Sequence, residues 1–559
     1  MRGLDGDSLE LILRSIRDFA RAKLPDATLL ELDARDEFPE ALVREMGSSL
    51  GVQLVFIDEE YGGLGGGAFD VYRVCEAAAR IDLGVSTGLL ATFLGSDPIA
   101  FGGTAEQKRR WLARIAEQGI IMAYAATEPE AGSDLAALRS TAERVLEDGR
   151  VVAYRLNGGK QWISNGGVAD VYTFLANAPG GPSWFVIEAG AGGLSHGVPE
   201  DKHGIRLSNT ATVTCEDVVV PADQLVGGVE GQGLVQAQLV FGYTRLMVAA
   251  FGLGAGWAAL DRAIAYSRER IQKGGPLSEK QGYTHKLIVP HAVALEAARA
   301  VIEETAERLD EGALGLNTEG AVAKLLASEA GCAAADAAIQ ALGGYGYTRH
   351  YMVEKIHRDV RITRIYEGTS EIMEMTIARD RWQDHLKTRG RLYHDAAASL
   401  EAVDERHPEV GAGAAALAHH ALAELFERAR AARLTRHQHL LLRLGELCAI
   451  VEGAACLARR AARAAEGKLP GKTDPRFSAP ELAAIARVWA RGAAARVVED
   501  GLRLVLGATQ GEDLTALEEA LRAHSVRRAQ VGLLADLDGV ADAVYGRSAA
   551  VRDAELARG

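Results

Sequence analysis

The feature that most constrains the fold is a change in sequence pattern between residues 121 and 230. Short runs rich in β-branched and aromatic residues occur there, such as VVAYRLNG, SWFVIEA and NTATVTCEDVVVP. Gly, Pro, Asn and Asp separate these runs at short intervals, which predicts an antiparallel sheet or barrel rather than alternating strands and helices. No GxGxxG follows a strand-like run, so the sequence does not indicate a nicotinamide-binding Rossmann domain.

Helical patterns lie on both sides of this region. With 559 residues the chain is longer than one hydrophobic core usually serves, so several domains are expected. Apolar residues recur at helical spacing in SLELILRSIRDFARAKL and in the long segment that begins LVQAQLVFGYTRLMVAAFG. We therefore expect a mostly helical protein with a central β domain, divided into residues 1–120 (helical), 121–230 (β), 231–385 (helical) and 386–559 (a further Ala/Arg/Leu-rich helical block).

Charge and cysteine content exclude several classes of protein. The net charge of −14 argues against a general nucleic-acid binder, which would need a basic surface. The five cysteines form no CxxC and no Cys/His cluster, which predicts reduced thiols, no metal site and a cytoplasmic location. The N-terminal stretch resembles neither a secretion signal nor a transit peptide, and no apolar run reaches the ~18 residues that span a membrane.

Two segments of the β region carry candidate binding residues. In MAYAATEPEAGSD, Thr127 and Ser133 offer hydroxyl and backbone donors for a flavin edge or a phosphate; an ordinary β-turn is the alternative. In LNGGKQWISNGGVAD, a Trp in a polar Gly/Asn context could stack beside a planar ring; a core Trp next to a hairpin turn is the alternative.

A third segment, QALGGYGYTRHYMVEKIHRDVRITRIYEGTSEI, carries a candidate catalytic carboxylate. Gly343 and Gly344 permit close backbone approach to a phosphate-bearing ligand. Glu367 follows Tyr366 and precedes Gly368, which predicts a loop position. A carboxylate beside an aromatic ring and desolvated by an acyl chain would have a raised pKa, as suits a general base that works on a weak carbon acid. The alternatives are a helix N-cap and a surface Glu.

Taken in order, these segments resemble the acyl-CoA dehydrogenase family. AYAATEPEAGSD resembles the first signature of that family, PIAFGGTAEQKRRWL the segment before it, and the third segment the second signature with its catalytic loop. The match covers about residues 1–385 and implies a helical domain, a β-barrel and a four-helix bundle. The run GGLSHGVPEDKHGIRLSNTATVTCEDVVVPADQLVG and the helical extension are most similar to the very-long-chain group.

The resemblance implies roles for individual residues. Glu367 lies where the family has its catalytic base; a second family position for the base is occupied by Thr244, before Arg245. The resemblance implies FAD as cofactor and contacts to it from Tyr124, Ala126, Thr127, Ser133, Trp162, Ser164, Arg270, Gln281, Gln340, Gly344, Thr369 and Glu371. Of these, Arg270, Gln281, Gln340 and Gly344 would act across a dimer interface. Substrate contacts are implied for Ser133, Arg245 and Gly368.

Some positions depart from the family pattern. Lys273 stands where the family usually has Phe against the adenine, and Glu371 stands where many members have Gln near the diphosphate. Asp97 and Pro98 lie where the floor of the acyl pocket is implied, and the long-chain group favours Gly in place of Pro98. These departures leave the length and branching of the acyl chain open.

The activity implied is α,β-dehydrogenation of an acyl-CoA thioester to a trans-2-enoyl-CoA. Glu367 would take the α-proton, the β-hydride would pass to flavin N5, and an electron-transfer flavoprotein would accept the electrons. Two alternatives stay open. One is an acyl-CoA oxidase that reduces oxygen, and the other is an assembly or binding protein that keeps the fold with little turnover.

The extension supports two further hypotheses. Its apolar helical faces must be buried, and packing on residues 231–385 of the same chain would cover the surface through which smaller family members form tetramers, so we expect a homodimer. Arg459, Arg460, Arg463, Lys468 and Lys472 form a basic cluster in residues 459–472, which suggests peripheral contact with anionic lipid at the inner face of a membrane. A solvated helix face is the alternative.

Overall fold

The computed structural model describes residues 3–511 and 513–547, apart from the side chains of residues 241–243. Two compact units are defined by their internal contacts. The first comprises residues 1–255, 306–314 and 358–362, and the second comprises residues 256–305, 315–357 and 363–559. The central β region lies in the first unit, and the extension lies in the second together with helices that precede it in sequence.

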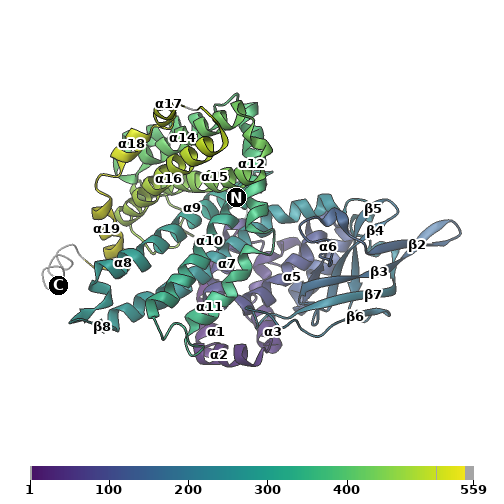
Figure 1. Cartoon of the computed structure of the whole chain (residues 1–559). Coiled ribbons are helices and arrows are strands. Elements are labelled where there is room, and N and C mark those ends of the chain that lie inside the picture. The colour runs from purple at the N-terminus through teal and green to yellow at the C-terminus, as the bar shows by residue number, and fades with distance from the viewer. Residues whose placement is uncertain (1–2, 512, 548–559) are drawn as a thin grey trace. The chain divides into compact units, whose positions relative to one another are not determined.

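The first unit begins with helices and continues into a sheet (Figure 1). Its helices are α1 (Gly6–Lys23), α2 (Asp26–Arg35), α3 (Glu40–Ser48), α4 (Ala68–Ile81), α5 (Leu83–Gly102) and α6 (Ala105–Gln118). Its strands are β1 (Met122–Ala125), β2 (Thr141–Glu147), β3 (Arg150–Ser164), β4 (Val171–Ala178), β5 (Gly181–Glu188), β6 (Leu194–His196) and β7 (Thr210–Pro221). Helix ends follow local capping: Thr104 and Gln107 form a capping box before α6, and Gly119 ends it in a left-handed conformation.

The sheet has the strand order β1-β4-β2-β3-β7-β6, with β5 paired to β4. Most neighbours are antiparallel, but β1 pairs with β4 in parallel, and Thr141 of β2 pairs with Asn177 of β4 in parallel. The expectation of an antiparallel sheet or barrel holds for most strand pairs, and the two parallel pairings are additions that the sequence did not reveal. The chain between β1 and β4 includes the whole β2–β3 hairpin, and a connection of that length allows a parallel return that no local pattern reveals.

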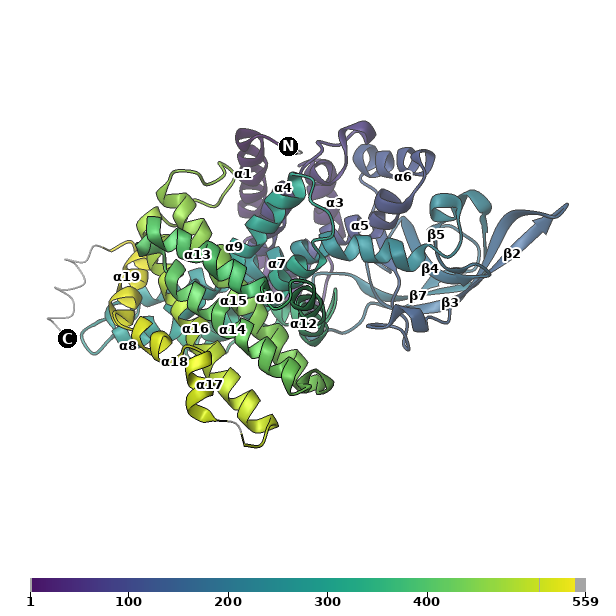
Figure 2. The same ribbon diagram turned by 90° about the horizontal axis from the view of Figure 1, so that it is seen from above.

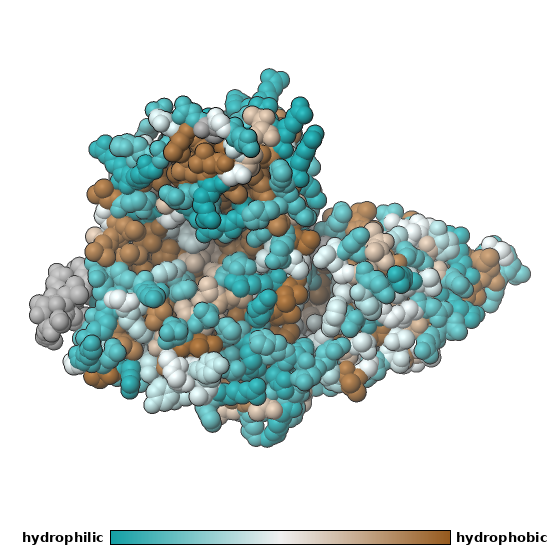
Figure 3. Space-filling model, viewed as in Figure 1, coloured by the Kyte–Doolittle hydropathy of each residue, from teal (hydrophilic) through white to brown (hydrophobic). Residues whose placement is uncertain are grey.

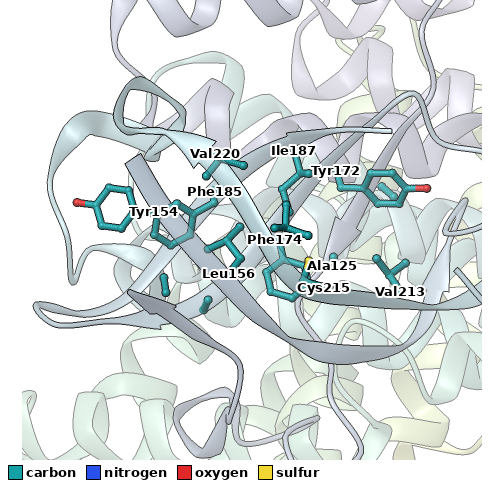
Figure 4. Packing of buried hydrophobic residues seen from close by; sticks show 14 of the residues in the cluster. Ala125, Tyr154, Leu156, Tyr172, Phe174, Phe185, Ile187, Val213, Cys215 and Val220 are labelled. Atoms are coloured by element: carbon teal, nitrogen blue, oxygen red, sulfur yellow. The ribbon is translucent and has the colours of Figure 1, made fainter. Parts of the chain in front are cut away.

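Alternating side chains of these strands form the core of the sheet. Tyr154, Leu156, Phe174 and Phe185 are buried in one cluster, and the rings of Tyr154 and Phe185 lie 5.0 Å apart (Figure 4). The cluster closes the curled sheet on one side, so the polar groups that remain on strand ends and turns are held on a rigid frame.

The second unit is built from helices (Figure 2). They are α8 (Gln281–Leu287), α9 (Val289–Asp310), α10 (Asn317–Leu342), α11 (Met352–Val360), α12 (Ser370–Lys387), α13 (Leu392–Arg406), α14 (Ala412–Ala431), α15 (Gln438–Ala465), α16 (Ala479–Ala508), α17 (Leu514–Ala520), α18 (Ala523–Ala529) and α19 (Leu533–Tyr545). The ends of α9 and α11 belong to the first unit. A small hairpin of β8 (Ile271–Gln272) and β9 (Gly275–Pro276) precedes α8.

Helix α7 (Gly233–Glu269) contributes residues to both units. Among the described residues it is the one helix long and apolar enough to cross a membrane by length and composition, and 87% of that apolar stretch is buried. Burial of this extent is typical of a core helix.

The extension packs on helices of its own chain. Helix α15 contacts α10 and α12. A Cβ on Gly445 would lie 2.0 Å from the backbone oxygen of Glu374, so only glycine allows α15 to approach α12 this closely. Arg381 of α12 forms two hydrogen bonds of 2.7 and 2.8 Å to Glu452 of α15.

Ion pairs within this packing change the interpretation of the basic cluster. Arg460 is buried and donates to Glu303 at 2.8 Å and to Glu296 at 2.9 Å, both on α9. Arg459 donates to Glu304 at 2.7 and 2.9 Å. These two arginines hold α15 on α9 and offer no charge to a lipid surface. The predicted membrane patch at residues 459–472 is thereby reduced to Arg463, Lys468 and Lys472, and Lys468 itself pairs with Glu466 at 2.8 Å.

Residues on the outside of the strand region are largely hydrophilic in the view of Figure 3. Exposed apolar side chains occur singly on strands, for example Leu146 and Val219. Trp162 is the exception in size, with 57% of its surface exposed. A single exposed ring is no proof of a binding site, so its meaning depends on the backbone around it.

Candidate functional site

The first part of the candidate site lies where β1 ends and β3 passes beside it, in the first unit. The backbone amide of Gln161 donates to the carbonyl of Thr127 at 2.9 Å, which joins residues 126–128 to residues 160–162. The ring of Tyr124 packs against Trp184 with centroids 4.6 Å apart. The hydrogen bond brings Thr127 next to the β3 segment that carries Trp162 and Ser164, and contact of these residues with a flavin stays a prediction.

Trp162 is exposed because the strand is irregular there. The register between β3 and β7 shifts between Lys160 and Ile163, and Trp162 has φ = 57°, a left-handed conformation that costs a non-glycine residue about 1–2 kcal/mol. Asn165 also has a positive φ, and its side-chain nitrogen donates to the carbonyl of Gly88 at 2.9 Å. The strained backbone and the exposed ring together reject the alternative of a core Trp and indicate a binding surface.

A buried ion pair holds this surface from below. Lys160 is 1% exposed and donates to Glu128 at 2.6 Å and to the carbonyl of Ala126 at 3.1 Å. Burial lowers the pKa of Lys160 to about 8, although Glu128 opposes that shift, so the ammonium is protonated at pH 7. No feature of the sequence pattern singled out this pair, because Glu128 lies in the turn after β1 and Lys160 lies on β3, 32 residues later.

Glu128 is fully satisfied by its other neighbours. It also accepts from the amides of Arg139 and Ser140 at 2.5 and 3.1 Å, and from the Ser140 hydroxyl at 2.6 Å. Burial opposes its ionisation, but the hydrogen bonds from Lys160, Ser140 and Arg139 outweigh that effect and keep the pKa of Glu128 below its usual value. The turn at residues 128–140 is thus tied to β3.

The remaining predicted residues of the first unit have mixed settings. Ser133 is exposed on the turn that follows Glu128. On α7, Thr244 is buried and Arg245 is half-buried, and Thr244 carries no carboxylate. Asp97 and Pro98 lie inside α5, which packs directly on β1: a Cβ on Gly95 would lie 2.8 Å from the amide nitrogen of Ala123.

The second part of the candidate site is the loop before α12, in the second unit. Glu367 is half-buried with φ = 54°, and Gly368 follows with φ = 93°. The N-cap of α12 is Thr369, whose hydroxyl accepts from the amide of Ile372 at 3.3 Å. Glu367 is therefore neither a helix cap nor a freely exposed side chain, and both alternatives left by the sequence are removed.

The Glu367 loop is held by the buried face of α10. Lys324, fully buried, donates to the carbonyl of Gly368 at 2.6 Å, and Ser328 donates to the carbonyl of Thr363 at 3.0 Å. Ser370 donates to Glu329 at 2.7 Å. A Glu with a left-handed backbone conformation persists only where its surroundings fix it. The strain at Glu367 and the hydrogen bonds around it therefore indicate a functional role for this carboxylate. Sequence analysis missed Lys324.

Glu371 is exposed in the first turn of α12. Three residues later comes Glu374, whose carboxyl pKa is raised. Burial, followed by the charges of Glu446 and Glu371, raises the pKa of Glu374 to about 7. Glu446 belongs to α15, so this group reports on the contact between the extension and α12.

The predicted interface residues lie elsewhere on the second unit. Arg270 and Gln340 are exposed, and Gly343 and Gly344 have open space where a Cβ would stand. Lys273 sits at the tip of the β8–β9 hairpin with φ = 46°. Gln281 donates its side-chain nitrogen to Asp538 of α19 at 3.0 Å, and its contact with a cofactor stays a prediction.

The chemistry of these groups fits a flavin and a thioester. The exposed Trp162 ring and the Thr127 hydroxyl suit the edge of a planar heterocycle, and exposed Arg270 suits a diphosphate. Within the part of the chain that the structure describes, no group of three His, Cys, Asp or Glu side chains is arranged to hold a metal ion.

Three family models match the chain. They are the N-terminal domain of acyl-CoA dehydrogenase at residues 6–119, its middle domain at 123–218 and its C-terminal domain at 231–381. An acyl-CoA dehydrogenase of Bacillus subtilis is 36% identical over 375 residues, covering 66% of this chain and 96% of that protein. Residues after 381 lie outside these family models.

Two solved structures are also similar. One is a chain from the structure described as the electron transferring flavoprotein of Acidaminococcus fermentans, with 35% identity and a TM-score of 0.63, covering 66% of this chain and 97% of that chain. The other is an acyl-CoA dehydrogenase complexed with FAD from Bacillus anthracis, with a TM-score of 0.81 over 98% of this chain and 95% of that chain. The second is 23% identical and shows that the fold, extension included, occurs elsewhere.

Proposed function

From the premise that this chain belongs to the acyl-CoA dehydrogenase family and is an FAD-dependent acyl-CoA dehydrogenase, we propose that Glu367 is its catalytic base. The observation that carries the proposal is the left-handed Glu367 on a loop fixed by Lys324. The absence of a carboxylate at Thr244 supports it, since the family's second position for the base is not acidic here.

In the proposed reaction the Glu367 carboxylate accepts the α-proton of the acyl-CoA thioester and ends as the neutral acid. FAD, when bound, supplies the acceptor for the hydride that leaves the β-carbon, so the product is a trans-2-enoyl-CoA. The bond from Lys324 to the carbonyl of Gly368 fixes the peptide after Glu367, which keeps the carboxylate aimed at one position rather than many. Entry of the acyl chain would exclude water from the half-buried carboxylate and favour proton transfer.

We propose that Tyr124, Ala126, Thr127, Trp162 and Ser164 line the flavin ring, with Ser133 at the turn beside it and Thr369 and Glu371 at the start of α12. Arg270, Gln340 and Gly344 are proposed to meet the cofactor of a second copy in a homodimer. Similarity to a chain of the Acidaminococcus structure supports an electron-transfer flavoprotein as acceptor.

The deciding experiment uses Glu367→Gln, which is nearly isosteric and cannot accept the proton at neutral pH. The variant should retain FAD and fold, but a panel of straight, branched and aromatic acyl-CoAs should not bleach its flavin under anaerobic conditions. Bleaching at more than a small fraction of the wild-type rate would refute the assignment. The same panel with the wild type, with and without oxygen, separates a dehydrogenase from an oxidase that releases peroxide.

A further inference from the structure

The segment that joins α7 to α8 is an arm that is exposed as far as Gly274 and partly buried after it. Residues 268–281 include the β8–β9 hairpin, whose two turn residues, Lys273 and Gly274, have φ values of 46° and 82°. Positive φ at both positions is the geometry of a type I′ turn. Ile271 beside the turn is 59% exposed. A two-stranded hairpin alone is marginally stable in water, so the arm needs support from outside.

Helix α19, the last described helix of the extension, supplies that support at both ends of the arm. The first base is the end of α7 at residues 267–268, and the second base is the start of α8 at residue 281. At the first base, the hydroxyls of Ser267 and Tyr545 are 2.8 Å apart in a buried contact, and Arg268 donates to the carbonyl of Tyr545 at 3.0 Å. Just after α19, Arg547 donates to the carbonyl of Ser278 at 2.9 Å. Figures 1 and 2 both show α19 beside α8.

Asp538 closes the second base. Its carboxylate accepts from Gln281 at 3.0 Å and lies 3.1 Å from Nε2 of His285, the second contact being an ion pair when that ring is protonated. Between these contacts, residues 269–274 are exposed, and the side chain of Arg270 has no hydrogen-bond or ion-pair partner among the described residues. The extension therefore fixes where the arm starts and ends and leaves its cationic side free.

We propose that α19 is a positioning clamp through which the extension sets how tightly the cofactor is held. This rests on the proposed function, in which Arg270 meets the FAD of a second copy. The clamp orders the arm before the second copy arrives, so less conformational entropy is lost when Arg270 engages the diphosphate. Gln281 then acts through Asp538 as part of the clamp, not as a direct ligand of FAD. The Bacillus subtilis relative matches this chain over 66% of its length, so the clamp is an addition to the shared part of the family.

The test compares four variants of the full-length holoenzyme. Asp538→Leu removes the acceptor at similar size, and Asp538→Asn keeps an acceptor for Gln281. Glu518→Gln is the matched control, since it breaks an exposed ion pair with Arg527 elsewhere in the extension. Arg270→Ala removes the proposed contact itself. Hydrogen exchange of the amides at 271–277 reports on the arm, and flavin fluorescence after dilution reports on FAD release.

Loss of one charge-assisted hydrogen bond should accelerate both arm exchange and FAD release about tenfold in Asp538→Leu. Asp538→Asn should remain near wild type, and Glu518→Gln should match it. Unchanged exchange at 271–277 in Asp538→Leu overturns the clamp. Faster exchange with unchanged FAD release, while Arg270→Ala does release FAD faster, overturns the coupling alone. If Arg270→Ala releases FAD at the wild-type rate, the proposed role of Arg270 fails, and the coupling fails with it.

Discussion

The buried Lys160–Glu128 pair allows a prediction that can be worked out from the contacts. Lys160→Met keeps a long side chain that still packs on Phe174, whose ring centroid lies 4.8 Å from the ammonium nitrogen. The change removes two hydrogen bonds and leaves Glu128 buried without its cation. Breaking one side of a buried pair costs about 3–5 kcal/mol. The three donors that remain on Glu128 place the expected cost at the low end, about 3 kcal/mol.

That cost should appear locally, because a chain with two compact units is not suited to one overall unfolding free energy. The amide of Gln161, bonded to the carbonyl of Thr127, reports directly on the junction of β1 and β3. About 3 kcal/mol corresponds to about a hundredfold faster exchange if that junction opens locally. Binding of FAD should weaken as well, because Trp162 follows the same bulge.

The matched control is Lys202→Met, which removes a lysine that is only half-buried and whose ammonium donates only to the carbonyl of Glu200, at 3.3 Å. A second variant, Lys160→Met with Glu128→Gln, removes the orphaned charge and should recover at least about 1 kcal/mol of the loss. If Gln161 in Lys160→Met exchanges within threefold of wild type, the pair does not hold the junction and the reasoning is refuted.

Three further predictions concern the second unit. Lys324→Met should lower the rate of flavin reduction about tenfold with little change in KM, because the carbonyl of Gly368 loses its donor and the Glu367 loop loosens; stopped-flow reduction measures this, and an unchanged rate would contradict it. The raised pKa of Glu374, about 7 against 4.5, means that the folded state binds more protons between these values, so the free energy of opening the contact between α12 and α15 falls as pH rises from 4.5 to 7. Glu374→Gln should therefore stabilise that contact at pH 8 by about 1 kcal/mol after allowance for its partial exposure, and not at pH 4; hydrogen exchange of the α12 amides, compared with wild type at each pH, tests it. Light scattering should give the mass of two 59.4 kDa chains, and a tetrameric mass would refute the idea that α15 covers the oligomer surface.

Local sequence patterns predicted the parts of the site that lie within one segment. Glu367 with its flanking Gly368, and Trp162 among its glycines and asparagine, stand out because turn residues and aromatic or acidic residues occur side by side. The strand-rich region was recognised from its β-branched runs for the same reason.

Contacts between distant segments could not be predicted in this way. Lys160 of β3 donates to Glu128 in the turn after β1, Lys324 donates to the carbonyl of Gly368, and Asp538 accepts from Gln281, which is 257 residues earlier. A cluster of arginines in sequence likewise says nothing about which carboxylates lie opposite. The sequence around Arg460 suggested a basic surface, but glutamates of α9 pair with this arginine in the interior.

The contact of Gly445 with the backbone of Glu374 bears on how the extension can be removed. One turn after its N-cap, and close to the loop of Glu367, helix α12 has a surface that only a glycine of α15 can approach. Cutting the chain after residue 386 would uncover that surface and leave the half-buried Arg381 without Glu452. A chain shortened there would therefore expose a face of α12 that is built to contact α15. Residue 386 is a boundary in the sequence, but the interface that holds the extension lies along α12.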